Sequence, residues 1–258
     1  LIGAKNDPAE GFPLLAKLLD ANDWLSVQVH PDDAQAKELE GQPRGKTEAW
    51  VILSAEPGAQ LVIGVEPGTD REAMATAIKT NTLEDLLVYA DVQVGDVLYI
   101  PAGTVHAIGP GIVLYEIQQS SNTTYRLYDW GRMGLDGKPR QLHIDKGVKV
   151  SNVAELPQIQ RFAEDESPEV RLVEGAFFTT ALHRLHTDIP ISIDKIDDRF
   201  DALTCIKGSL AINGAGVSIT CDAGRTVLIP ASVESYTMQG EAQVLRSRQR
   251  GPMMRWSR

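Results

Sequence analysis

The amino-acid sequence predicts an all-β protein with a sandwich or barrel in each half and a small helical insertion. Short runs that read as strands, separated by turn residues, recur along most of its 258 residues, a pattern typical of sandwiches and barrels. Residues 95–106 and 224–235 also align, because each has a Gly, an apolar strand and a Pro six residues after that Gly. This repetition indicates an internally duplicated fold.

The sequence predicts three strands and a short helix after a first segment that could be either a helix or a strand. Residues 12–20 carry leucines at helix-like spacing but are short enough for a buried strand, so both types stay open. Residues 24–30 alternate in the manner of a strand. Pro31 then begins a helix that ends at Gly41. Residues 47–65 predict two further strands joined by the turn EPGA.

The helical insertion is predicted over residues 69–89. Thr69 or Asp70 is suited to cap its first turn, and a second capped turn begins near Asn81 or Thr82. Downstream of the insertion the sequence returns to short strands and tight turns.

A domain boundary is predicted within residues 154–170, which are acidic, contain prolines and lack apolar periodicity. We therefore expect one domain over residues 1–153, which includes the helical insertion, and a second over residues 171–258. The sequence does not begin with Met, and we expect part of an N-terminal sheet to be missing from it.

Composition excludes several classes of partner. The formal charge of -10 and a pI near 5.0 argue against a nucleic acid or an anionic membrane, since an acidic surface gains nothing from releasing their counterions. The apolar runs are too short to span a bilayer, and no signal-peptide pattern opens the chain. Only Cys205 and Cys221 are present, which fits a reducing compartment. We expect a cytoplasmic monomer or homodimer.

One motif combines turn residues with a histidine. Gly95, Pro101, Gly103 and His106 follow the spacing Gly, five residues, Pro, one residue, Gly, two residues, His. Gly95 turns the chain into a strand, and Pro101 and Gly103 shape the turn at its end, so that His106 points into a barrel mouth. The pattern resembles the second conserved motif of the cupin family, which implies two cupin, or jelly-roll-like, domains.

The aligned segment of the second half lacks this histidine. Ser232 stands where the motif has Gly, and Ser235 stands where it has the histidine. We interpret the second cupin as a degenerate copy without a metal.

Further candidate ligands precede the motif. Gln28 and His30 are two residues apart in a strand pattern and therefore project from the same face. Glu48 begins another strand, and His106 follows a third. Two imidazoles, a carboxylate and an amide oxygen form a set suited to zinc, with an open position for water or a substrate oxygen.

Four separated segments make the resemblance specific. They resemble the signature segments of type I mannose-6-phosphate isomerases, strongly over about residues 10–150: FPLLAKLLDANDWLSVQVHPDD, GKTEAW, YIPAGTVHAI and YRLYDWGR. The resemblance implies Zn²⁺ bound by Gln28, His30, Glu48 and His106. It also implies interconversion of mannose 6-phosphate and fructose 6-phosphate through a cis-enediol, with zinc as the electrophile.

The same resemblance implies the residues that meet the sugar phosphate. Arg126 and Lys46 match family positions for both catalysis and substrate binding, and Lys17 and Ser26 match positions for substrate binding. Local positive charge of this kind is needed to hold a phosphate in an acidic protein. Glu116 matches an acidic active-site position and is a candidate for acid/base or proton-relay work, although a structural ion pair fits it equally well. The sequence does not decide which group is the catalytic base.

Two other functions remain open. One is a cupin oxygenase or epimerase that uses iron or manganese at the same ligands. The other is a sugar-phosphate-binding module without turnover. The three readings differ in the metal they require and in whether a sugar phosphate is converted.

Overall fold

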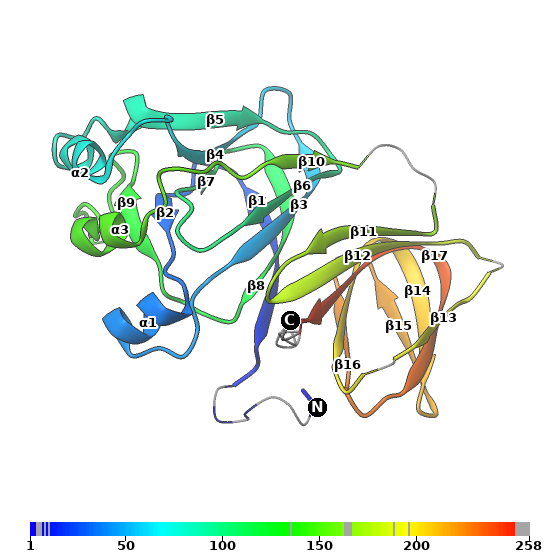
Figure 1. Cartoon of the computed structure of the whole chain (residues 1–258). Helices are drawn as coiled ribbons and strands as arrows, with labels where there is room; N and C mark the ends of the chain where they lie inside the picture. Colours follow the sequence, from blue (N-terminus) through cyan, green and yellow to red (C-terminus); the bar gives the residue numbers. More distant parts are fainter. Residues whose placement is uncertain are drawn as a thin grey trace, which may run out of the picture. The chain divides into compact units, whose positions relative to one another are not determined.

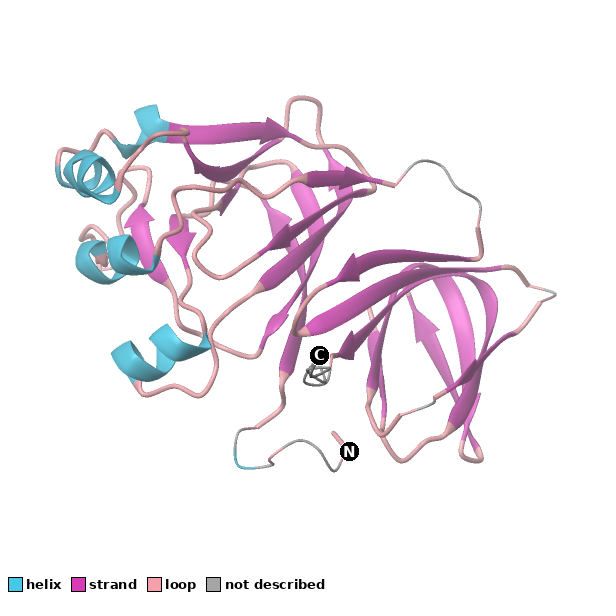
Figure 2. Cartoon of the chain, viewed as in Figure 1, coloured by secondary structure: helices cyan, strands magenta, loops and turns pink. Residues whose placement is uncertain are grey.

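The computed structural model describes residues 1–3, 7, 9, 11–134, 136–162, 167–187, 189–195 and 197–250. The chain divides into two compact units. The first unit is Leu15–Arg161, and the second unit combines Leu1–Leu14 with Phe162–Arg258. Strands dominate both units (Figure 1; Figure 2), which confirms the all-β prediction. No helix among the described residues is long and apolar enough to cross a membrane.

The first unit contains one large sheet and two small ones. Every strand pairing whose register is recorded in this unit is antiparallel. The five-stranded sheet has the order β1 (Leu14–Ala21), β8 (Ile112–Gln119), β3 (Glu48–Ala55), β6 (Asp96–Ile100) and β10 (Ile159–Arg161). The small sheets are β5 (Leu87–Asp91), β4 (Gln60–Val65) and β7 (Ala107–Ile108), and the pair β2 (Val27–Val29) with β9 (Tyr125–Tyr128). The segment at residues 12–20, for which the sequence allowed either a helix or a strand, thus forms strand β1.

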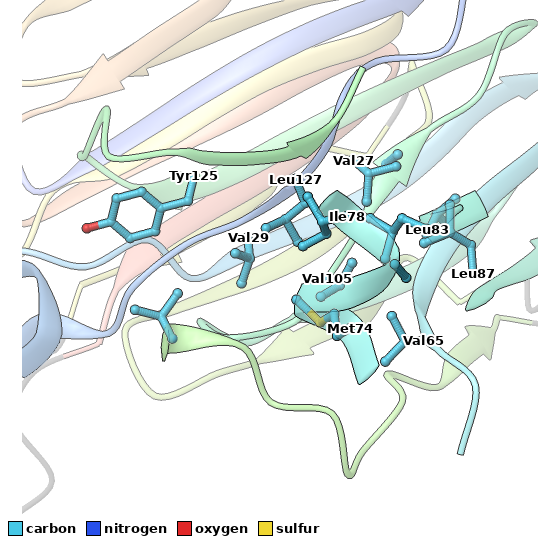
Figure 3. Packing of buried hydrophobic residues seen from close by; sticks show 14 residues of the cluster. Val27, Val29, Val65, Met74, Ile78, Leu83, Leu87, Val105, Tyr125 and Leu127 are labelled. Carbon is cyan, nitrogen blue, oxygen red and sulfur yellow. The ribbon is translucent and has the colours of Figure 1, made fainter. Parts of the chain in front are cut away.

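Two apolar clusters hold these layers together. One packs the large sheet against β4 and β7 and contains Trp50, Leu98 and Ile108. The other joins β2 and β9 to the helical side of the unit, and Figure 3 shows Val27 and Val29 among its members. Because Val27 and Val29 point into this cluster, the intervening Gln28 and the following His30 project from the opposite face of β2.

The helix predicted after Pro31 is confirmed as α1 (Asp33–Glu40). Asp32 caps it with a capping box: its carboxylate accepts from the Gln35 N–H, and the Gln35 side chain accepts from the Asp32 N–H. Gly41 ends the helix with a φ of 65°. Asp33 then accepts hydrogen bonds from the Gly45 N–H and from the Gln119 side chain, which ties the segment before β3 to the end of β8.

Substitution of Asp32 by alanine is expected to lower the free energy of unfolding by about 1 kcal/mol, since the first turn of α1 loses its side-chain acceptor. Asp32→Ser, which keeps an acceptor oxygen, serves as the matched control. Urea unfolding followed by circular dichroism measures both variants. Equal destabilisation by alanine and serine would contradict the role of the cap.

The helical insertion is shorter than predicted. α2 (Arg71–Lys79) is capped by Asp70 as expected, and a 3₁₀ helix, η2 (Leu83–Leu86), follows. The prediction of helix up to residue 89 is wrong, because Leu87–Asp91 forms β5 and pairs with β4. Pairing with a distant strand outweighs the local helical pattern here.

The domain limits also differ in detail from the predicted ones. Part of the predicted linker at 154–170 forms strands, since β10 pairs with β6, and β11 (Glu169–Glu174) belongs to the second unit. Residues 163–166 of the linker lie outside the described residues. Leu1–Leu14 groups with the second unit although the sequence predicted it in the first domain. Contacts made far along the chain decide this assignment, and a linear sequence pattern does not reveal them.

The second unit is a seven-stranded antiparallel assembly with its own apolar cluster. Its longest strands are β14 (Asp201–Gly214) and β17 (Ser235–Gln249), and they pair along most of their lengths. The remaining strands are β11, β12 (Phe178–Leu185), β13 (Ile191–Asp194), β15 (Val217–Asp222) and β16 (Thr226–Ile229). Gly95 before β6 and Gly224 before β16 both have positive φ, 88° and 84°, which fits the predicted likeness of the two segments. The helix α3 (Ile144–Val150) belongs to the first unit.

Candidate metal centre

Three of the predicted metal ligands meet in the first unit, although they come from distant parts of the chain. His30 follows β2, Glu48 opens β3, and His106 lies between β6 and β7. One ligand atom from each lies within 4.8 Å of the other two, and all three side chains are buried. The sheets therefore bring two imidazoles and one carboxylate into a single centre.

Backbone carbonyls orient both imidazoles. Nδ1 of His30 lies 2.9 Å from the Thr123 carbonyl, and Nδ1 of His106 lies 2.9 Å from the Thr104 carbonyl. Because a carbonyl can only accept, each Nδ1 carries a proton and each Nε2 keeps its lone pair. The Nε2 atoms of His30 and His106 lie 3.5 and 3.6 Å from the two oxygens of Glu48. Both lone pairs thus face the carboxylate.

The centre fits a metal ion. Among the described residues, Nε2 of His106 and Oε2 of Glu48 are buried without a hydrogen-bond partner. Two acceptors facing each other in a buried site are unfavourable unless a cation or a donor lies between them. Imidazole nitrogen and carboxylate oxygen are common ligands of divalent metals. The unpartnered atoms are therefore explained by metal binding.

Lys46 reaches the same centre. Its Nζ donates to Oε1 of Glu48 and lies 3.0 Å from Nε2 of His30, and only 6% of the residue is exposed. A buried ammonium of this kind requires an ionised partner, and Glu48 provides it.

The protonation states of the centre suit metal binding. Burial alone would raise the pKa of Glu48, but Lys46, His30 and His106 hold that pKa down at about 2. Burial, followed by the charge of Lys46, lowers the pKa of His30 well below its usual value, and burial lowers the pKa of His106. At neutral pH the carboxylate is therefore ionised and the imidazoles are neutral, as metal ligands must be.

Gln28 lies beside this centre. Gln28 and His106 exchange two backbone hydrogen bonds of 2.9 Å, so their side chains project to the same side of the bridge. The side chain of Gln28 is half-buried and shares the strand face of His30. The backbone thus places Gln28 where its amide oxygen can serve as a further ligand.

A second polar group adjoins the ligands on the large sheet. Nζ of Lys17 donates to Glu116 over 2.6 Å and to Gln118 over 2.5 Å. Nε1 of Trp50 donates to the other oxygen of Glu116 over 3.1 Å. Trp50 pairs directly with Glu116 across β3 and β8, as Glu48 does with Gln118. Trp50 and Glu48 are two residues apart on the same face of β3, so Glu116 lies on the face of the candidate ligand Glu48, opposite the neighbouring position.

The surroundings of Glu116 shift the pKa of its carboxyl group. Burial raises its pKa, the charge of Glu48 acts in the same direction, and Lys46 and Lys17 oppose the shift. A buried carboxyl group whose pKa is raised is a candidate for proton transfer, because its environment favours the neutral form more than water does.

Arg126 and Ser26 lie near β2, but in the described part of the chain no side-chain hydrogen bond joins either of them to His30, Glu48 or His106. Arg126 pairs with Gln28 across β9 and β2, while its Nη1 donates to the Gln141 carbonyl over 3.0 Å. Burial, and after it the charge of Arg140, lowers the pKa of Arg126. Ser26 is buried directly before β2. The guanidinium is thus engaged by the segment after β9.

Sequence reasoning missed two residues of this site. Trp50 and Gln118 hold Glu116 and Lys17, respectively. The alternation of Glu48, Trp50 and Ile52 along β3 is a signal that could have placed Trp50 on the ligand face. Gln118 could be placed at the site only by knowing that β8 pairs with β3, which the local sequence does not reveal.

Comparison with known proteins identifies the family. Mannose-6-phosphate isomerase ManA of Bacillus subtilis is 34% identical over 237 residues, which are 91% of this chain and 74% of that protein. The chain belongs to the mannose-6-phosphate isomerase family. Mannose-6-phosphate isomerase of Streptococcus mutans is 48% identical over 148 residues, and this match spans 57% of the chain and 46% of the relative's length.

Family models and solved structures agree with this assignment. The model "Phosphomannose isomerase type I, catalytic domain" matches residues 2–49, and "Mannose-6-phosphate isomerase, cupin domain" matches residues 169–249. The crystal structure of mannose 6-phosphate isomerase from Bacillus subtilis aligns with a TM-score of 0.82 at 30% identity, covering 92% of this chain and 75% of that one. The predicted type I family and cupin fold are thereby confirmed.

A zinc-bound mannose 6-phosphate isomerase shares the fold. Its crystal structure aligns with a TM-score of 0.71 at 16% identity, covering 95% of this chain and 81% of that one.

Proposed function

We propose that this mannose-6-phosphate isomerase family member interconverts mannose 6-phosphate and fructose 6-phosphate with Zn²⁺ bound by Gln28, His30, Glu48 and His106. The observation that carries the proposal is the buried cluster of two neutral imidazoles and an ionised carboxylate beside the Glu116 group. The nitrogen and oxygen ligands suit zinc, and the zinc-bound relative supports the same metal.

The chain's own groups have separate tasks in this proposal. Bound zinc supplies an electrophile for the substrate oxygens. Glu116 moves a proton between C1 and C2 of the sugar as the cis-enediol forms and collapses, and the Trp50 N–H and the Lys17 ammonium hold its carboxyl group. Neutral imidazoles would add no positive charge beside the metal, and Glu48, which also pairs with Lys46, would supply the negative charge.

Cationic and hydroxyl groups would hold the sugar phosphate. We assign Lys17, Lys46, Arg126 and Ser26 to this task, with Lys46 and Arg126 also acting in catalysis. Lys17 is about one third exposed, at 34% of its side chain, so that it can contact both the solvent-borne substrate and Glu116. In a chain of net charge -10, such local positive charge is what a phosphate group requires.

Metal removal tests the proposal. A chelator is expected to abolish turnover of mannose 6-phosphate in a coupled isomerase assay, and stoichiometric zinc is expected to restore it, with metal content followed by elemental analysis. Full turnover by the metal-free protein would contradict a role for zinc. Recovery with iron or manganese alone would point to the oxygenase or epimerase reading, and a folded, zinc-loaded protein without turnover would point to a binding module.

The substitution Glu116→Gln is expected to lower kcat by about 100-fold, because the amide cannot accept the substrate proton. KM and zinc content are expected to stay near their original values, since Glu116 is not one of the proposed ligands. Glu72→Gln, an exposed change of the same kind on α2, is the matched control. Unchanged kcat in Glu116→Gln would show that this carboxylate only pairs with Lys17.

A further inference from the structure

The second unit contains a cavity of its own that the proposed isomerase function does not use. It has a volume of about 250 Å³, and its walls carry five arginines: Arg171, Arg199, Arg246, Arg248 and Arg250. This concentration of positive charge stands out in a chain whose formal charge is -10. All of the residues that line the cavity belong to the second unit.

Strand register places part of this cluster on the inner face of the unit. Arg246 pairs directly with Leu203 of β14 and with Ala181 of β12, and Leu203 belongs to the apolar cluster of the unit. Directly paired residues project to the same face of a sheet, so Arg246 shares the face of the core. Arg248, two residues further along β17, does so as well.

Acidic side chains balance some of these arginines. Nε of Arg246 lies 3.0 Å and Nε of Arg248 lies 2.5 Å from the two oxygens of Asp201, a residue with no exposed surface. Asp197 contacts Arg248 over 2.6 Å and Arg199 over 3.4 Å. The inner arginines are thereby held in place by buried or half-buried carboxylates.

The positive charges of the arginines at the cavity outnumber the negative charges of the described acidic residues around them. Among the described residues, the five arginines are opposed by Asp197, Asp201 and the two glutamates that line the cavity, Glu169 and Glu174, which leaves one net positive charge. Arg171 meets Glu174 in a pair whose side chains are 67% and 56% exposed, so that pair holds Arg171 only weakly.

Arg250 has no acidic partner within the described part of the chain. Its Nη1 donates to the Gly175 carbonyl over 3.0 Å. Arg250 therefore adds to the cavity wall a guanidinium charge that no described carboxylate opposes.

We propose that this arginine-lined cavity binds a small phosphate-bearing anion. The guanidinium groups come from β11, from the segment before β14, and from β17 with the residue after it, so they approach from several directions, as the oxygens of a tetrahedral phosphate require. A volume of about 250 Å³ lies just below that of common ligand pockets, roughly 300 to 1,000 Å³. It therefore suits inorganic phosphate or a short phosphate monoester.

The experiment compares inorganic phosphate binding by the full chain with binding by the double variant Arg171→Gln/Arg250→Gln. Isothermal titration at constant ionic strength is expected to show affinity at least about tenfold lower for the variant, which corresponds to about 1.4 kcal/mol. Both changes leave the ion pairs of Asp201 intact. The double variant Lys207→Gln/Arg225→Gln removes the same charge from exposed positions of the second unit and is expected to bind phosphate like the original chain.

Equal phosphate affinity in the two double variants would overturn the proposal. Because all of these proteins keep the same metal centre, binding there cancels in the comparison. Thr179→Glu provides a second test that leaves every arginine in place, since Thr179 lines the cavity and pairs directly with Arg248. The added carboxylate is expected to occupy the site and abolish the phosphate response that the cavity provides, and an unchanged response would likewise overturn the proposal.

Glycerol 3-phosphate and succinate distinguish the sources of the anion. Binding that is lost in Arg171→Gln/Arg250→Gln is attributed to the cavity. If that binding is tighter for glycerol 3-phosphate than for phosphate, the natural ligand is a phosphorylated metabolite, and the reverse order identifies free phosphate as the ligand. Tighter binding of succinate than of either would overturn the phosphate class. The isomerase assay is independent of these outcomes, so failure of this proposal leaves the proposed function untouched.

Discussion

His106→Ala is expected to remove the metal and to lower isomerase turnover by about 1,000-fold or more. Loss of a residue that only supports a metal ligand costs about 10- to 100-fold, and His106 contributes a lone pair directly to the centre. The substitution also removes Nε2 of His106, which faces Oε2 of Glu48 over 3.6 Å. Zinc content by elemental analysis and turnover of mannose 6-phosphate measure the two effects separately.

His186→Ala is the matched control for this prediction. His186 is exposed and belongs to the second unit, so that its loss removes the same side chain without touching the centre. We expect zinc content and turnover of this variant to equal those of the original chain. Normal zinc content in His106→Ala would show that His106 is no ligand, whatever its turnover.

Glu48→Gln is expected to lower the free energy of unfolding of the metal-free protein by about 3 to 5 kcal/mol at pH 7. The change removes the carboxylate that pairs with the buried ammonium of Lys46, and a buried charge left without its partner carries a cost of about this size. Glu66→Gln, an exposed change of the same kind, is the control. Denaturant unfolding in the presence of chelator measures the free energy of unfolding of the original chain and of both variants.

The same variant is expected to change the pH dependence of stability. The pKa of Glu48 is about 2 in the folded chain, below its usual value of 4.5, so the stabilisation is complete above pH 4.5 and is lost as the pH falls towards 2. The gap between the original chain and Glu48→Gln should therefore narrow between these two pH values. A gap that stays constant over this range would contradict an ionised, paired Glu48.

Much of the metal centre could be predicted from local sequence. The two-residue spacing of Gln28 and His30 fixes their common face, and the glycines and the proline around His106 fix its turn, because both features depend on neighbouring residues only. In β2 the buried Val27 and Val29 alternate with the half-buried Gln28, and this alternation can be read from the sequence. The structure brings His30, Glu48 and His106 together as the motifs implied.

Other features depend on partners that lie far along the chain. The pattern of residues 69–89 predicts helix, yet Leu87–Asp91 is a strand because β4 pairs with it. The ion pair of Lys17 with Glu116 requires β1 and β8 to be neighbours in the sheet. The arginine cavity had a sequence signal, since Arg246, Arg248 and Arg250 recur with the period of a strand. Asp201, the acidic partner of Arg246 and Arg248, comes from another strand.

The bridge between Gln28 and His106 also has a consequence for how the chain folds. These residues are joined by backbone hydrogen bonds although about half of the first unit separates them in sequence. Closing so long a loop is slow and entropically costly. Metal affinity should therefore develop late during refolding, after β2 has met the segment that carries His106. A nascent chain that has not yet emerged as far as His106 would lack the site, which limits metal capture to a chain that extends at least to that residue.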